Sequence, residues 1–277
     1  MKLWGDVSVV HLLSLLWPPF IDGRNHVLVV QMAQERFSFR GCNLSCIFCQ
    51  NHEISHSRFG KEVSIEKLAE IFLELQDKNV HNINLVSPTP YVPQIIAALD
   101  IAKKQGLTLP IVYNTNSYEN IETIKMLDGY VDIYLPDLKY FDDSVAIEFS
   151  SAPNYFSTAS STILTMQKQV GKNQFDEEGI MQKGIIVRHL ILPHHVLQTK
   201  KILKWIKENM PKDTYISIMA QYFPTYKAKE HPLLNRKITS REYDIVLNML
   251  SDFENGYVQD LSDCEEEYVP NFDLSGI

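Results

Sequence analysis

Hydrophobic positions along this 277-residue chain follow two alternating patterns. Short runs rich in Ile, Val, Leu, Phe and Tyr have the composition of strands that are buried on both faces. The longer segments between these runs carry apolar residues at the period of an amphipathic helix. The predicted strands are residues 35–40, 82–86, 110–114, 131–135, 184–192 and 214–219.

The helical segments have recognisable ends. Ser64 is a good N-cap for a helix whose apolar face runs from Ile65 to Leu75. The next two helices are predicted over residues 92–104 and over the segment marked by Ile121, Ile124 and Leu127. They are followed by Gly106 and Gly129, and glycine often ends a helix. Further helices are predicted over residues 155–170, 196–209 and 240–250.

Alternation of strand and helix predicts parallel βαβ units. Six strands are fewer than the eight of a closed barrel, so we expect an α/β fold, a partial, open parallel β/α barrel of about six strands. In such barrels the loops at the carboxyl ends of the strands build the active site. Candidate functional residues are therefore expected in loops 41–55, 87–91, 115–118, 136–140, 193–195 and 220–229.

Composition narrows the class of protein. Hydrophobic residues make up 45% and charged residues 22%, the balance of a globular protein. The net charge of −8 (26 basic against 34 acidic residues) gives no basic patch for nucleic acid or for an anionic membrane. The apolar run at residues 11–17 is shorter than a membrane span and lacks the flanks of a signal peptide. We expect a cytoplasmic protein that binds neither nucleic acid nor a membrane.

Three of the four cysteines, Cys42, Cys46 and Cys49, lie in one polar loop after the first predicted strand, and the fourth is Cys264. This clustering indicates metal binding or catalysis in a reducing compartment. Three thiolates on a cubane iron–sulfur cluster leave one iron without a protein ligand, whereas most clusters are held by four cysteines. A zinc site that adds His52 as fourth ligand is the main alternative.

The cysteine spacing, with the aromatic Phe48 directly before the third cysteine, resembles the radical S-adenosylmethionine (radical SAM) superfamily. The sequence around and after the cysteines resembles the branch of this superfamily that is named for its likeness to pyruvate formate-lyase activating enzyme. The segments that carry this resemblance are residues 41–51, 82–86, 113–115, 132–140, 188–193 and 221–224. The resemblance implies a four-iron, four-sulfur (4Fe-4S) cluster on Cys42, Cys46 and Cys49, with S-adenosyl-L-methionine on its open iron.

The same resemblance implies cofactor contacts at the strand ends, by the residues Phe48, Asn114, Thr115, Asp137, Lys139 and Arg188. Ser117 stands where the family has a glycine, and residues 87–90 replace a family Gly-Gly-Glu segment that is not carried over. Asp137 and Lys139 have a surface ion pair as their alternative. Arg188 lies within an apolar strand, so we expect a carboxylate partner from the cofactor or from Asp137. His189 is expected to be a satisfied core residue.

The resemblance implies an enzyme, an oxidoreductase or activating enzyme, that makes a 5′-deoxyadenosyl radical for hydrogen abstraction. It also implies a reductant such as flavodoxin or ferredoxin, and a glycyl radical enzyme as protein substrate. Two alternatives stay open: an iron–sulfur electron carrier or redox sensor that does not cleave S-adenosylmethionine, and a zinc-stabilised binding module.

The resemblance stops just before Gly41. In the family that the chain resembles, the sequence before the cluster cysteines is Gly-Ser-Gly-Thr-Ile-Phe-Phe-Ser-Gly. Residues 32–40 can be back-translated into codons that encode this peptide when translation starts at the third base of the Met32 codon. We hypothesise that the residues before Gly41 are read in a shifted frame. The chain is thus divided into an atypical segment, 1–34, a radical SAM partial barrel, 35–260, and an acidic C-terminal tail, 261–277.

Overall fold

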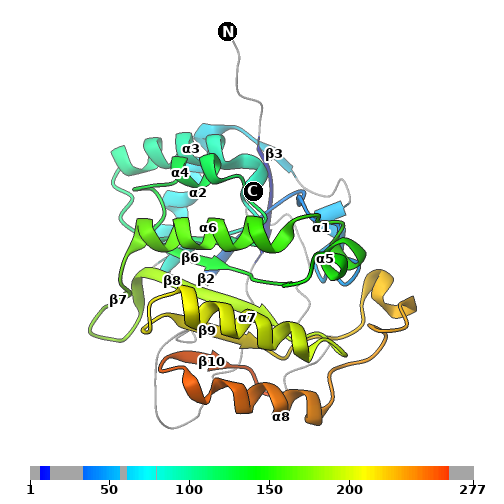
Figure 1. Ribbon diagram of the computed structural model, residues 1–277. Helices are drawn as coiled ribbons and strands as arrows, with labels where there is room; N and C mark the ends of the chain where they lie inside the picture. Colours follow the sequence, from blue (N-terminus) through cyan, green and yellow to red (C-terminus); the bar gives the residue numbers. More distant parts are fainter. Residues whose placement is uncertain (1–6, 13–33, 57–60, 79, 262–277) are drawn as a thin grey trace.

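One sheet organises the chain in the computed structural model, which describes residues 7–12, 34–56, 61–78 and 80–261 (Figure 1). Most of the predicted atypical segment 1–34, and residues 262–277 of the predicted acidic tail, lie outside the described residues. Along the sheet the strands follow the order β10-β9-β8-β6-β5-β4-β2-β1-β3, and β7 pairs with β8. The described sheet therefore ends at β10 on one side and at β3 on the other, which is an open barrel.

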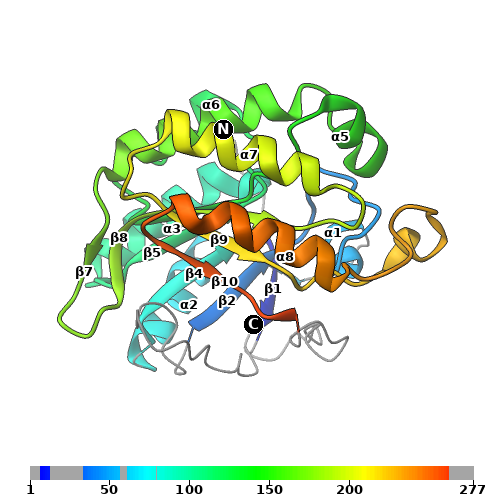
Figure 2. The same ribbon diagram turned by 60° about the horizontal axis from the view of Figure 1, so that its bottom comes forward.

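Seven neighbouring strands of this sheet run parallel. They are β2 (Gln34–Phe39), β4 (Asn82–Val86), β5 (Ile111–Thr115), β6 (Ile133–Pro136), β8 (Met181–Leu190), β9 (Tyr215–Met219) and β10 (Gly256–Val258). The first six are the predicted strands, with bounds that differ by a few residues, so the predicted fold is confirmed. The short β10, which pairs with β9, was not predicted (Figure 2).

Three further strands pair antiparallel. Strand β1 (Val7–Leu12) pairs with β2 and with β3 (Lys61–Val63), and β7 (Gln174–Phe175) pairs with β8. These pairings extend the sheet beyond β2 and add a short ribbon beside β8.

The predicted helices are all present. They are α2 (Ile65–Asp77), α3 (Val92–Lys104), α4 (Ile121–Met126), α6 (Tyr155–Val170), α7 (Val196–Asn209) and α8 (Ser240–Met249). Ser64 caps α2 as predicted, because its hydroxyl accepts a hydrogen bond from the Lys67 backbone N–H at 3.1 Å. None of the helices in the described ranges is long and apolar enough to cross a membrane.

Short helical elements were not predicted. They are α1 (His52–His56), α5 (Asp143–Ser150) and the 3₁₀ turns η1 (Thr89–Tyr91), η2 (Tyr226–Glu230) and η3 (Leu250–Asp252). Four of these five follow strands β2, β4, β6 and β9. They lie in, or directly after, the loops in which the site was expected.

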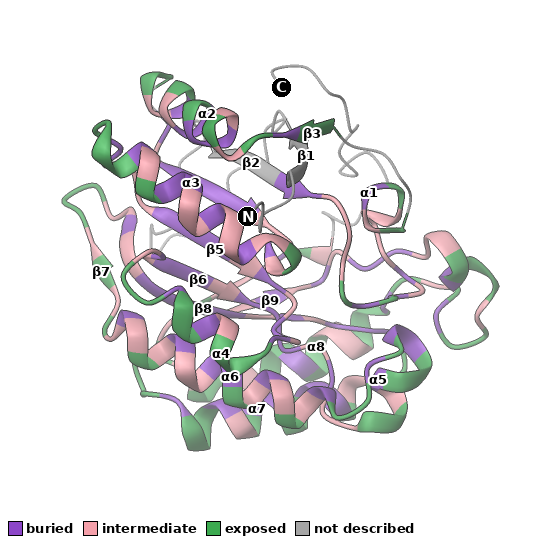
Figure 3. Cartoon of the chain, turned by 90° about the horizontal axis from the view of Figure 1, so that it is seen from above, coloured by how far each residue is buried: buried purple, intermediate pink, exposed green. Residues whose placement is uncertain are grey.

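The two faces of the sheet differ. Tyr113 belongs to the larger core, which the helices cover, and buried residues line the strands and the inner sides of those helices (Figure 3). Val112 and Ile186 belong to a smaller apolar cluster on the opposite face. Because side chains alternate along a strand, Asn114 and Arg188 lie on that second face, two residues nearer the carboxyl ends of β5 and β8. The barrel interior is therefore apolar at one end and polar at the carboxyl ends of the strands.

Candidate functional site

The cysteine loop is fixed to the C-terminus of α5. The backbone N–H groups of Ser45 and Ile47, on either side of Cys46, donate to the carbonyl oxygens of Ser150 (3.0 Å) and Phe149 (2.9 Å). The last turn of a helix leaves carbonyl groups without helical partners, and the loop uses two of them. The position of Cys46 is thus set by backbone hydrogen bonds.

Each of the three cysteines has a side-chain hydrogen-bond partner. The Ser150 hydroxyl donates to Cys46 Sγ at 2.9 Å, and Asn116 Nδ2 donates to Cys42 Sγ at 3.4 Å. The hydrogen bond between Cys49 Sγ and Ser55 Oγ is 3.7 Å long. Such partners orient metal ligands and tune the metal that they hold.

Burial governs the thiol chemistry of this loop. It raises the pKa of Cys46 to about 12, against the attraction of the Lys139 ammonium. It also raises the pKa of Cys49. A buried thiol gives up its proton when a positive metal centre compensates the charge of the thiolate. These sulfurs therefore suit metal ligation better than they suit a free nucleophile.

The donor set fits an iron–sulfur cluster. Cys42, Cys46 and Cys49 supply three sulfur donors from one loop, and cysteine thiolates are the ligands that hold 4Fe-4S clusters. His52, the fourth ligand of the zinc alternative, points Nδ1 at the Cys49 carbonyl oxygen (3.2 Å) and stacks on Tyr226.

A charged group lies at the end of β6. Asp137 receives the Lys139 ammonium at 2.7 Å and Arg188 Nε at 2.8 Å, and Arg188 Nη2 also donates to Asn114 Oδ1 at 2.6 Å. Burial alone would raise the pKa of Asp137, but Arg188 and Lys139 outweigh it and lower this pKa. The expected carboxylate partner of Arg188 is therefore Asp137. The pair is buried, which excludes the surface ion pair weighed for Asp137 and Lys139.

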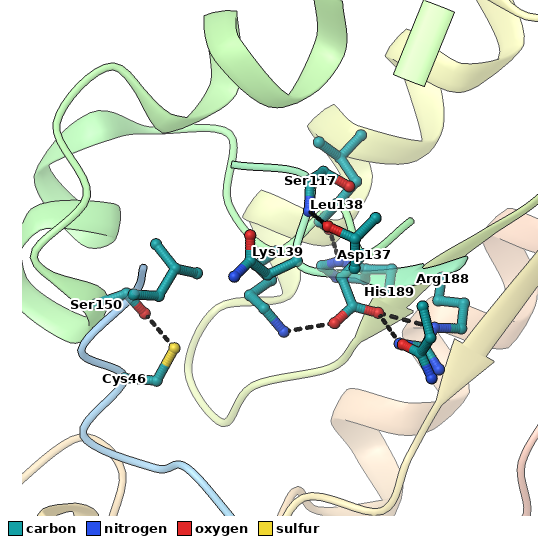
Figure 4. A network of polar contacts seen from close by, with 12 residues as sticks. Cys46, Ser117, Asp137, Leu138, Lys139, Ser150, Arg188 and His189 are labelled. Atoms are coloured by element: carbon teal, nitrogen blue, oxygen red, sulfur yellow. Dashed lines mark hydrogen bonds and ion pairs between the residues drawn. The ribbon is translucent and has the colours of Figure 1, made fainter. Parts of the chain in front are cut away.

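Lys139 connects this charged group with the cysteine loop. Figure 4 shows its side chain between the Cys46–Ser150 pair and the Asp137–Arg188 pair. Two cations and one carboxylate leave the group with a net positive charge. Such a group, beside metal-ligating sulfurs, favours an anionic part of a ligand.

The other predicted contacts have different surroundings. Phe48 is buried, with its ring edge-on to Tyr222 at 5.9 Å between centroids. Thr115 is also buried, and its hydroxyl donates to Glu119 at 2.6 Å. Ser117 adopts the left-handed conformation, with φ of 65°, where the family has a glycine. Ser117 thus adopts a backbone conformation that favours glycine.

His189 is the satisfied core residue that was expected. Its Nδ1 lies 2.7 Å from the Leu138 carbonyl oxygen and its Nε2 lies 2.9 Å from Thr199 Oγ1. Burial lowers its pKa to about 4. Its ring is therefore neutral at ordinary pH and fully used within the protein.

Sequence reasoning did not find Ser150, and it placed Asn116 in an expected loop without giving it a role. Ser150 reaches Cys46 across 104 residues of chain, and nothing in the sequence links the two positions. Asn116 had a usable signal, since it follows β5 directly in a strand-end loop.

Comparison with known proteins gives a family match. Residues 37–159 match the model of the radical SAM superfamily. Residues 37–159 thus form a radical SAM domain. Proteins of this superfamily use a 4Fe-4S cluster and S-adenosylmethionine.

Among curated proteins, the chain is 32% identical over 232 residues to an uncharacterized protein of Methanocaldococcus jannaschii. The match covers 80% of this chain and 63% of that protein. The structure resembles SuiB of Streptococcus suis bound to the precursor peptide SuiA, with a TM-score of 0.54, 15% identity and coverage of 79% and 47%. It also resembles anSMEcpe with bound AdoMet, with a TM-score of 0.54, 13% identity and coverage of 79% and 61%. The chain thus spans less than two thirds of each of these proteins.

Proposed function

We propose that this protein is a radical SAM enzyme whose cluster is held by Cys42, Cys46 and Cys49. The observation that carries the proposal is that Cys46 and Cys49 lie within electrostatic reach of Lys139 of the charged group, at the carboxyl ends of the strands. When bound, the cluster and S-adenosylmethionine together supply a 5′-deoxyadenosyl radical that abstracts hydrogen from a substrate. The protein supplies orientation and a pocket from which water is excluded.

The charged group has a defined task in this proposal. Lys139 lies nearest the cysteine loop and pairs with a carboxylate of the ligand. Asp137 holds the Lys139 and Arg188 side chains in place, and Asn114 orients the Arg188 guanidinium. Both cationic donors, Lys139 and Arg188, are therefore positioned before a ligand binds, which lowers the entropy cost of binding.

Two aromatic and polar contacts complete the proposed cofactor site. Phe48 supplies an apolar surface for the adenine, because its ring is packed rigidly against Tyr222. Thr115 contributes by position, since its hydroxyl is engaged by Glu119 and fixes the start of the loop that carries Asn116.

For the substrate we propose a protein or peptide, with activation of a glycyl radical enzyme as the specific reaction. The resemblance of the motifs to the pyruvate formate-lyase activating enzyme branch supports this. Solved structures of similar fold are described with bound peptides, SuiB with SuiA and anSMEcpe with Cp18Cys. A cytoplasmic flavodoxin or ferredoxin is the proposed reductant.

Anaerobic reconstitution tests the proposal. The full chain should take up about four irons, and dithionite with S-adenosylmethionine should then release 5′-deoxyadenosine. Cys49→Ala should lose iron and activity, whereas Cys264→Ala, a matched cysteine outside the loop, should keep both. A cluster without 5′-deoxyadenosine supports the electron-carrier alternative. Zinc in place of iron after anaerobic purification supports the zinc-stabilised module.

A further inference from the structure

Two buried hydroxyl groups form a chain that ends on the Cys46 sulfur. Ser150 Oγ lies 2.9 Å from Cys46 Sγ, and the Tyr140 hydroxyl lies 2.5 Å from Ser150 Oγ. Both Ser150 and Tyr140 are only 1% exposed. Ser150, which lies beside Cys46 in Figure 4, ends α5, and Tyr140 follows β6, so two separate parts of the chain supply these hydroxyl groups.

The direction of these hydrogen bonds is fixed once Cys46 is a metal-bound thiolate. A thiolate has no proton and can only accept, so the Ser150 hydroxyl must donate to it. The single Ser150 proton is then used, and the Tyr140 hydroxyl must donate to Ser150 Oγ. Both O–H dipoles therefore point toward Cys46, and each strengthens the other.

The backbone of the cysteine loop is held without the Ser150 hydroxyl. The carbonyl oxygens of Ser150 and Phe149 accept the backbone N–H groups on either side of Cys46. These backbone bonds do not involve the Ser150 hydroxyl, so they survive its removal. The loop therefore does not need that hydroxyl to keep its shape.

Cys46 differs from the other two ligands in this respect. The corresponding bonds to Cys42 and Cys49 are longer, at 3.4 Å and 3.7 Å, and both of those cysteines are partly exposed. Water can replace a lost donor more easily at an exposed sulfur than at the buried Cys46. The strongest effect on the cluster is expected from the donor on Cys46.

We propose that Ser150 and Tyr140 are positioning residues that raise the reduction potential of the cluster bound through Cys46. This inference rests on the proposed function, because it requires a cluster on the cysteine loop. Reduction adds negative charge to the cluster, and hydrogen bonds to its sulfurs stabilise the more negative state. Loss of these donors makes the cluster harder to reduce.

An anaerobic redox titration, followed by the electron paramagnetic resonance (EPR) signal of the reduced cluster, tests this inference on the reconstituted full chain. Ser150→Ala should keep its iron but shift the midpoint to a more negative potential. At a fixed potential the ratio of reduced to oxidised cluster should fall by about three- to tenfold. Tyr140→Phe, which removes only the outer hydroxyl, should shift it in the same direction by less.

Tyr134→Phe is the matched control. Its hydroxyl is also part of a fully buried tyrosine, but it donates to Gln169 at 2.7 Å and not toward a cysteine. This variant should titrate like the wild type. A shift of equal size in Tyr134→Phe contradicts the assignment to the hydroxyl chain.

The outcomes separate this inference from the proposed function. A Ser150→Ala protein with full iron content and an unchanged midpoint overturns the inference and leaves the cluster intact. If Ser150→Ala takes up no iron, Tyr140→Phe decides, and an unchanged midpoint there overturns the inference. Wild-type protein without iron contradicts the proposed function itself. Shifted midpoints without S-adenosylmethionine cleavage support the inference and contradict only the proposed activity.

Discussion

Replacing Asp137 by asparagine removes a negative charge from between two cations while the side chain keeps nearly the same size. In the wild type the carboxylate lies 2.7 Å from Lys139 Nζ and 2.8 Å from Arg188 Nε. The Asp137, Lys139 and Arg188 side chains are 12%, 17% and 22% exposed. Water therefore does little to screen the two cations once the carboxylate is gone.

The size of the effect follows from this burial. Removing one partner of a buried ion pair costs about 3–5 kcal/mol, because the other charge is left uncompensated. Asparagine keeps one oxygen that can accept a hydrogen bond from Lys139 or Arg188, but not from both with full charge. We therefore expect Asp137→Asn to lower the free energy of unfolding by about 3 kcal/mol, at the lower end of that range.

Equilibrium urea unfolding at pH 7, with and without the substitution, measures this difference. Asp252→Asn is the matched control, since Asp252 also lies 2.7 Å from a lysine, Lys207, but both side chains are more than half exposed. The control should change the free energy of unfolding by less than about 1 kcal/mol. A loss below about 1 kcal/mol in Asp137→Asn as well would refute the reasoning, because removing the carboxylate from a buried ion pair would then cost no more than removing it from an exposed one.

The pH dependence gives a second test of the same group. The folded pKa of Asp137 lies below its ordinary value of 3.8. A carboxyl group with a lowered folded pKa stabilises the protein above its unfolded pKa, and this stability is lost as the pH falls through the folded value. The gap between the wild type and Asp137→Asn should be constant above pH 3.8 and should narrow below it.

Three other predictions concern separate features. Ser64→Ala removes the N-cap of α2 and should lower the free energy of unfolding by about 1 kcal/mol in urea titrations, whereas an unchanged midpoint contradicts the capping role. The pKa of His189 falls from 6.5 to about 4 on folding, so the unfolded state binds more protons between these values and stability should decline as the pH drops through that range. In His189→Asn the free energy of unfolding should depend less on pH over this range. A pH dependence equal to that of the wild type would mean that other groups cause it. Resequencing the gene should reveal a supernumerary base near the Arg40 and Gly41 codons. An intact reading frame there would contradict the hypothesis that the residues before Gly41 are read in a shifted frame.

The long elements could be predicted because their hydrophobic pattern is strong. Strands such as β4, buried over most of its length, and helices such as α2, with one apolar face and an N-cap, carry their own signal. Strand β10 has three residues and begins with Gly256, so neither pattern nor propensity marks it. Helix α5 is short and ends at Ser150, whose backbone is fixed by the cysteine loop as much as by its own sequence.

The candidate site divides in the same way. The charged group was predictable, since a buried Arg188 needs a carboxylate and the carboxyl ends of parallel strands meet at one edge of the sheet. The hydroxyl chain was not, because Ser150 meets Cys46, and Tyr140 meets Ser150, only through the packing of α5 against the cysteine loop and the segment after β6. Such a contact between distant segments leaves no periodic pattern in a single sequence.

In the proposed function, Cys42, Cys46 and Cys49 hold a cluster whose open iron binds S-adenosylmethionine. The EPR spectrum of the dithionite-reduced cluster, recorded with and without S-adenosylmethionine, tests this most directly. A changed spectrum with about four irons per chain is the predicted result, since the ligand binds an iron that no cysteine occupies. An identical spectrum in the presence of excess S-adenosylmethionine would contradict the claim.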